Sequence, residues 1–280
     1  MENISFSKMS GAGNDFIIID KNSNPSFVLS QNAIKNLCSR RTGIGADGLI
    51  TIEDSDELDF NMNYFNADGS TGSLCGNGAR CAVYAAELSG RIKNKRTDFY
   101  SNGARYSAEV IAGEVVKFNL NNPVDLKLNF TIQPDGVPVK ASFINTGSPH
   151  VVIDIKDLNT IRELNEIPVF NLGRSIRYLN DFKPGGTNVN FIERRKDEIA
   201  IRTYERGVED ETLACGTGSV AAAVIAFINY HIQPPIKIKT FGGDELIVNF
   251  KIKEESVEEL SLTGPAKQIF TGTFSLNKFL

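Results

Sequence analysis

Residues 74–79, LCGNGA, and residues 214–219, ACGTGS, are two versions of one motif in which a cysteine precedes Gly-x-Gly. Each motif opens a run of small, mostly apolar residues, at about 76–89 and 216–230. A helix that is apolar on nearly every side must be buried on every side. The two motifs therefore predict two buried helices at equivalent places, one in each half of the chain.

The elements around each helix follow in the same order in both halves. Helical spacing predicts one further helix in each half, at 31–40 after an N-cap at Ser30 and near 158–166. The strands expected before the buried helices lie at 16–20, 49–53 and 60–65 in the first half and at 151–155, 185–193 and 199–205 in the second. Three strand-like runs follow each buried helix.

Equivalent positions in the two halves keep a nearly constant separation. Ile18 and Val152 are 134 residues apart, and Cys75 and Cys215 are 140 apart. We therefore predict an α/β (α+β) fold of two homologous domains related by a pseudo-twofold axis, each a curled, mostly antiparallel sheet around its buried helix. The expected N-terminal domain is 1–121 with a returning segment at 267–280, and the C-terminal domain is 122–266.

Composition excludes several functional classes. A length of 280 residues allows two domains, and a formal net charge of −4 gives no electrostatic case for binding nucleic acid or an anionic membrane. Two histidines exclude a His-rich metal site, and the four cysteines form no CxxC pair. Because we find neither a signal peptide nor an apolar run near ~18 residues, we expect a cytoplasmic protein with reduced thiols.

Cys75 and Cys215 each stand at the expected N-terminus of a buried helix, beside backbone N–H groups that have no partner within the helix. This place lowers the pKa of a thiol from its usual value of about 8.5, and the N–H groups suit a substrate carboxylate. The expected pseudo-twofold arrangement brings the two sulfurs face to face. Two acid/base groups on opposite sides of one carbon suit inversion of a stereocentre. For Cys38 and Cys81 we expect simple packing.

Six segments together resemble the diaminopimelate epimerase family. They are FSKMSGAGNDF (6–16), RRTGIGADG (40–48), FNADGSTGSLCGNGARC (65–81), GSPH (147–150), TNVNF (187–191) and TYERGVEDETLACGTGS (203–219). The resemblance spans nearly the whole chain. It implies a cofactor-independent isomerase, a homodimer, that interconverts LL- and meso-diaminopimelate in lysine and peptidoglycan precursor biosynthesis, with its site between two like-folded domains.

The resemblance also assigns roles to individual residues. Cys75 and Cys215 become the acid/base pair, with His150 and Glu205 as neighbours that tune the thiol pKa values. Arg206 is expected to clamp the distal carboxylate. The implied substrate-binding residues are Asn14, Asn66, Gly76, Asn77, Asn188, Glu205, Arg206, Gly216 and Thr217. No metal ligand is implied.

Three positions depart from the pattern of the family. Gly48 stands where some members carry a Gln that reaches the substrate, so we expect that contact to be absent or supplied by water. Ser148 replaces an Asn, and its hydroxyl has a shorter reach. Phe270 replaces a Tyr associated with dimer contacts, which leaves a homodimer with altered contacts as the expectation.

The residues alone leave other functions open. A cysteine hydrolase would pair His150 with only one of the two cysteines. A proline or hydroxyproline racemase of the same fold would use both cysteines, and an amino-acid-binding module would exchange no α-proton. The Gly-rich segment 43–48 follows a helix and precedes a strand, which is the reverse of the order in a dinucleotide-binding turn. We therefore expect no nucleotide cofactor.

Overall fold

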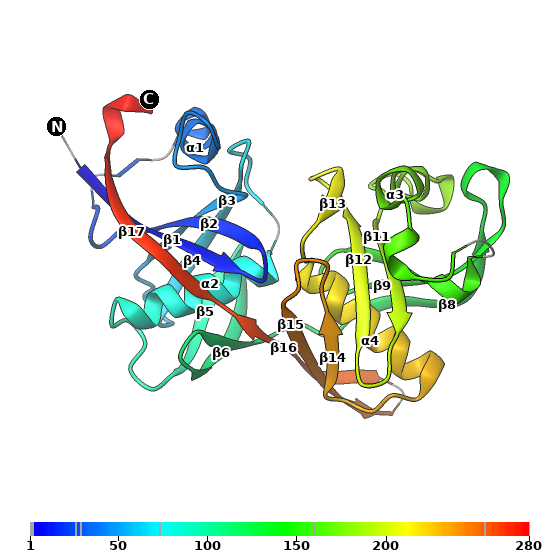
Figure 1. Ribbon diagram of the computed structural model, residues 1–280. Coiled ribbons are helices and arrows are strands. Elements are labelled where there is room, and N and C mark those ends of the chain that lie inside the picture. The colour runs from blue at the N-terminus through cyan, green and yellow to red at the C-terminus, as the bar shows by residue number, and fades with distance from the viewer. Residues whose placement is uncertain are drawn as a thin grey trace. The chain divides into compact units, whose positions relative to one another are not determined.

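The computed structural model describes residues 3–279 except 26, 29, 73, 159, 160 and 255. The chain forms two compact units, Met1–Asn119 with Thr263–Leu280, and Leu120–Leu262 (Figure 1). Among the described residues, no helix is both long and apolar enough to cross a membrane.

The first unit contains the helices α1 (Gln31–Cys38) and α2 (Gly76–Leu88). Its strands are β1 (Asn3–Gly11), β2 (Asn14–Asp20), β3 (Gly48–Glu53), β4 (Phe60–Asn66), β5 (Arg96–Ser101), β6 (Ala104–Ala112), β7 (Val115–Asn119) and β17 (Lys267–Ser275). β2 and β3 are parallel, β3 and β4 antiparallel, β4 and β5 parallel, and β5 and β6 antiparallel. β1 pairs antiparallel with both β2 and β17.

The second unit contains the helices α3 (Val169–Arg177) and α4 (Gly216–Tyr230). Its strands are β8 (Val124–Ile132), β9 (Val139–Asn145), β10 (Pro149–Asp154), β11 (Asn188–Arg194), β12 (Ile199–Glu205), β13 (Asp210–Thr212), β14 (Ile236–Lys239), β15 (Glu245–Lys253) and β16 (Ser256–Pro265), the last of which ends beyond the boundary. The pairs β10–β11, β11–β12, β12–β14 and β14–β15 alternate parallel and antiparallel in the same order as in the first unit. The internal duplication is therefore present in the topology.

Each unit buries one central helix, as predicted. α2 packs against β1, β2, β3, β4, β6 and β7, and α4 packs against β9, β10, β11, β12, β14 and β15 (Figure 1). All residues from Gly216 to Ala226 are buried. Small side chains permit this packing: a Cβ added at Gly11 would lie 2.8 Å from Asn77 O and 2.9 Å from Cys81 Sγ. β1 can approach α2 so closely because residue 11 has no side chain.

Of the two shorter helices predicted from the sequence, one is present and one is not. α1 follows Ser30, whose Oγ accepts the Ala33 N–H at 3.1 Å, as predicted. The helix predicted near 158–166 is wrong: Asn159 and Thr160 lie outside the described residues, and the described remainder forms only a 3-10 turn at Leu164–Glu166. The α-helix begins after Pro168, because proline is compatible with a helix start and not with a helix interior.

Candidate active site

Cys75 is the N-cap of α2, with an extended backbone, and its Sγ accepts the Gly78 N–H at 3.4 Å. A Cβ added at Gly78 would lie 3.1 Å from Ile50 Cδ1 and 3.5 Å from Phe16 Cε1. The glycine therefore lets the start of the helix lie directly against these two side chains. The sulfur lies at the end of α2 where the helix dipole favours negative charge.

Two predicted binding residues of the first unit share one hydrogen-bond chain. The Asn77 amide donates to Asn14 Oδ1 at 2.7 Å, and the Asn14 amide donates to Asp47 Oδ2 at 3.0 Å. The fully buried Arg80 donates to Asn77 Oδ1 at 2.9 Å and to Gly76 O at 3.3 Å. Sequence reasoning did not identify Arg80 as part of this cluster, although a charge within an apolar helix was a signal for it.

Asn66 and Gly48 are neighbours in the pairing of β4 with β3. The Asn66 amide donates to Ser70 Oγ at 3.0 Å. A Cβ added at Gly48 would lie 2.5 Å from Tyr64 Cε2, a distance that real Cβ atoms do not show. Any side chain at 48 would therefore require Tyr64 to move, and its Cβ would also lie 2.6 Å from the backbone oxygen of Phe65.

Cys215 is the N-cap of α4 and is 7% exposed. Its Sγ lies 3.6 Å from Thr217 Oγ1, which in turn lies 2.9 Å from His150 Nε2. Ser148 Oγ is 2.9 Å from the same ring nitrogen and 3.2 Å from Thr217 Oγ1. The structure thus brings together three residues that the sequence analysis had assigned to one site.

His150 is fully buried, and burial lowers its pKa to about 3, with the positive charge of Arg206 contributing in the same direction. A hydrogen bond with Asn190 acts in the opposite sense. The imidazole is therefore neutral near pH 7. Its contacts with Thr217 Oγ1 and Ser148 Oγ are therefore hydrogen bonds of a neutral ring and not those of a cation.

Asn188, Glu205 and Arg206 lie at the end of the β11–β12 pair. Asn188 Oδ1 accepts the Arg206 N–H at 2.9 Å, and Thr212 Oγ1 donates to Glu205 Oε2 at 2.8 Å. The Arg206 side chain is half-buried, and burial, then the charge of Arg177, lowers its pKa. Within the part of the chain that the structure describes, no carboxylate forms an ion pair with Arg206. Its guanidinium remains available for the carboxylate of a ligand.

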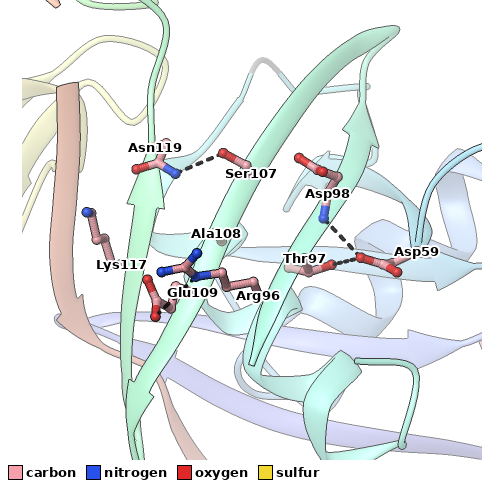
Figure 2. A pocket seen from close by; sticks show the side chains of 9 residues that line it. All are labelled: Asp59, Arg96, Thr97, Asp98, Ser107, Ala108, Glu109, Lys117 and Asn119. Atoms are coloured by element: carbon pink, nitrogen blue, oxygen red, sulfur yellow. Dashed lines mark hydrogen bonds and ion pairs between the residues drawn. The ribbon is translucent and has the colours of Figure 1, made fainter. Parts of the chain in front are cut away.

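A cavity of about 400 Å³ lies elsewhere in the first unit, on β5, β6 and β7 (Figure 2). Its lining is polar and includes Asp59, Thr97 and Lys117. Asp59 Oδ2 accepts from Thr97 Oγ1 at 2.9 Å and from the Asp98 N–H at 3.0 Å. None of the predicted site residues lines this cavity.

The other two cysteines are buried in the first unit. Cys38 and Cys81 are buried, and burial raises the pKa of each thiol to about 12. Over the described ranges, no group of three or more His, Cys, Asp or Glu side chains is placed to hold a metal ion.

Solved structures of low sequence identity share this fold. A probable proline racemase from Agrobacterium radiobacter matches with a TM-score of 0.75 and 15% identity, over 99% of this chain and 94% of that one. A phenazine biosynthesis protein of the PhzF family from Bacillus anthracis matches with a TM-score of 0.73 and 13% identity, over 98% of this chain and 100% of that one.

Sequence relatives are much closer. The profile of the family described as diaminopimelate epimerase matches residues 6–124 and 142–269. A diaminopimelate epimerase of Chlorobaculum tepidum is 44% identical over 274 residues, covering 96% of this chain and 100% of that protein. One of Aquifex aeolicus is 40% identical over 282 residues, covering 96% and 97%. With both cysteine motifs inside the matched ranges, the chain belongs to the diaminopimelate epimerase family.

Proposed function

We propose that this protein epimerises LL-2,6-diaminopimelate to meso-diaminopimelate, without a cofactor, in the formation of lysine and peptidoglycan precursors. The observation that carries the proposal is the duplicated cysteine: Cys75 and Cys215 each cap a buried helix at the same place in the two units. Family membership supports the choice of substrate, since the relatives described above are diaminopimelate epimerases.

The proposed mechanism uses one sulfur as a thiolate base and the other as a thiol acid. The thiolate removes the α-proton, and the thiol delivers a proton to the opposite face, which requires one sulfur on each face of the α-carbon. The negative charge that develops spreads onto the adjacent carboxylate. Backbone N–H groups at Gly76, Asn77, Gly216 and Thr217 are suited to stabilise that charge, because they belong to the first turns of α2 and α4.

The remaining predicted residues are proposed to bind the rest of the substrate. Arg206 takes the distal carboxylate, since its half-buried guanidinium has no ion-pair partner among the described residues. Asn14, Asn66, Asn188 and Glu205 bind the ammonium and carboxylate groups. These residues favour diaminopimelate over amino acids that lack a distal carboxylate, because such a substrate leaves the Arg206 charge unpaired.

The test is incubation of the protein with LL-diaminopimelate in deuterium oxide without added cofactor. We expect meso product with deuterium at one α-carbon, and a loss of at least ~100-fold in both Cys75→Ala and Cys215→Ala, the low end of a general acid/base contribution. Cys38→Ala is the matched control, since it removes a buried thiol outside the site. Near-full epimerisation by either of the first two variants contradicts the two-thiol mechanism.

The fold shared with a probable proline racemase makes proline the natural second substrate to test. The same deuterium assay with L-proline is expected to give no exchange, because proline has no distal carboxylate for Arg206. Exchange into proline at a rate comparable with diaminopimelate would move the proposal to a racemase of that class.

We further propose that the protein is a homodimer. Ile269 and Phe270 of β17 are 56% and 48% exposed, which is a large apolar exposure for adjacent residues of one strand. Sedimentation of the purified protein is expected to give twice the monomer mass, and Phe270→Lys is expected to give the monomer mass. A monomeric wild-type protein contradicts this proposal.

A further inference from the structure

The orientation of the Asn190 amide is fixed by its neighbours. Asn190 is fully buried on β11, and its Nδ2 lies 2.9 Å from Val151 O. A backbone carbonyl can only accept, so the amide nitrogen and not the oxygen must face Val151. Asn190 Oδ1 in turn accepts from Thr203 Oγ1 at 3.0 Å. Rotating the amide by half a turn would place two oxygens against each other.

The second proton of this amide determines the tautomer of His150. Asn190 Nδ2 lies 3.1 Å from His150 Nδ1, so Nδ1 accepts a hydrogen bond and carries no proton. The ring is neutral near pH 7, because burial lowers its pKa to about 3; Arg206 is the charged group that acts on it. The single ring proton therefore resides on Nε2, which lies 2.9 Å from Thr217 Oγ1 and 2.9 Å from Ser148 Oγ.

The Nε2–H tautomer of His150 determines where the hydroxyl proton of Thr217 points. Because Thr217 Oγ1 faces the Nε2–H donor, its own proton points away from His150, toward Cys215 Sγ at 3.6 Å or Ser148 Oγ at 3.2 Å. A charged acceptor forms the stronger hydrogen bond, so when Cys215 is ionised the Thr217 hydroxyl donates its hydrogen bond to the sulfur and not to Ser148.

We propose that Asn190 is a positioning residue that holds His150 in the Nε2–H tautomer and so directs the Thr217 hydroxyl to stabilise the thiolate of Cys215. This inference rests on the proposed function, in which Cys215 must ionise to act as a base. This series of hydrogen bonds from Asn190 through His150 and Thr217 to Cys215, here called the relay, is particular to the second unit. In the equivalent parallel pairs, β2–β3 and β10–β11, the counterpart of Asn190 is Ile50 and that of His150 is Phe16, neither of which can form it.

Gly218 makes the close approach of Asn190 to α4 possible. A Cβ added at Gly218 would lie 2.4 Å from Asn190 Oδ1 and 3.3 Å from Cys215 Sγ. At Gly78, the counterpart in α2, the nearest atom is the flexible end of Ile50 at 3.1 Å. The same glycine therefore admits an amide in one unit and an aliphatic side chain in the other.

The tautomer can be measured directly, because the chain has only His150 and His231. In protein labelled with 15N-histidine, nuclear magnetic resonance is expected to find His150 with its proton on Nε2, with exposed His231 as the internal reference. Asn190→Asp, whose carboxylate only accepts, is expected to move the proton to Nδ1. A wild-type His150 protonated at Nδ1 overturns the proposal, and so does an unchanged tautomer in a folded Asn190→Asp protein.

A second measurement tests the effect on the sulfur. In a Cys75→Ala background, the rate of alkylation of Cys215 by iodoacetamide is followed against pH by mass spectrometry of its peptide. Asn190→Leu and Thr217→Val are expected to raise the midpoint by about one pH unit, a tenfold change corresponding to one lost hydrogen bond to a charged group. Leucine is used here because an aspartate would itself repel a thiolate.

Ser219→Ala is the control for the loss of a buried hydrogen bond, since Ser219 Oγ donates to the backbone Cys215 O at 2.9 Å and does not touch the relay. Equal midpoints in wild type and Asn190→Leu overturn the proposal, as do equal shifts in Asn190→Leu and Ser219→Ala. Neither measurement needs substrate. Failure of the proposed function would appear instead as an absence of deuterium exchange in the wild-type protein.

Discussion

Burial of a neutral His150 makes the folded protein sensitive to acid. Its pKa is about 3 in the folded chain and ~6.5 in the unfolded chain. Between these two values the unfolded chain binds one proton more than the folded chain, so the free energy of unfolding rises with pH. On acidification below about pH 6.5 this one group removes ~1.4 kcal/mol per pH unit, which is about 2 kcal/mol at pH 5. The loss is complete near the folded pKa.

The assay is urea unfolding near neutral pH and at about pH 5, followed by far-ultraviolet circular dichroism, because the chain has no Trp. Carboxylates also titrate in this range, so the informative quantity is the difference between variants. His150→Gln has no group that titrates there. His231→Asn is the matched control, since His231 is exposed at the left-handed C-cap of α4, a conformation that asparagine adopts readily.

Wild type and His231→Asn are expected to lose about 2 kcal/mol more than His150→Gln over this interval. The same loss in all three proteins would show that folding does not lower the pKa of His150, and would refute the low pKa that burial gives this imidazole. A larger loss in His150→Gln would refute it as well.

Three further outcomes follow from local geometry. Gly218→Ala should cost about 1–3 kcal/mol of stability in the same urea assay, because its Cβ meets Asn190 at 2.4 Å; an unchanged midpoint would contradict that contact. Ser30→Ala should lose about 1 kcal/mol through removal of the α1 cap, measured by thermal melting, and a stabilised variant would be the contrary result. Cys38 and Cys81, whose pKa values burial raises to about 12, should stay unmodified when the native protein is treated with iodoacetamide at about pH 8, and labelling of either would disagree.

The parts of the fold that sequence predicted are those that local patterns determine. The all-round apolarity of α2 and α4, and the Ser30 cap of α1, are properties of short segments. α3 was misplaced because its position depends on Pro168, after which it begins, and on tertiary packing. A Cβ added at Gly173 would lie 2.4 Å from Tyr204 Cβ, so the helix packs against Tyr204 only where it carries this glycine. β8 was missed because it is exposed along most of its length, with left-handed residues at Asp125 and Asn129, so it lacks the alternation of a half-buried strand.

The candidate site divides in the same way. Cys75 and Cys215 stand in local motifs and were identified from them. Asn190 was not identified, since its role exists only when the β10–β11 pairing places it beside His150, which is 40 residues away in the sequence. Asn190 was visible beforehand in the strand sequence NVNFIER, but its partner was not.

The pairing of β17 with β1 has a consequence for synthesis on the ribosome. Asn3 pairs with Ser275 and Ser10 with Lys267, so one side of β1 has no strand partner until almost the whole chain has been made. The intervening unit, 120–262, is complete by then. At roughly 5–20 residues per second, about 15–50 s separate the emergence of β1 from that of its last neighbour. During that interval the growing chain presents an open strand edge, the feature that most invites wrong pairing between nascent polypeptides.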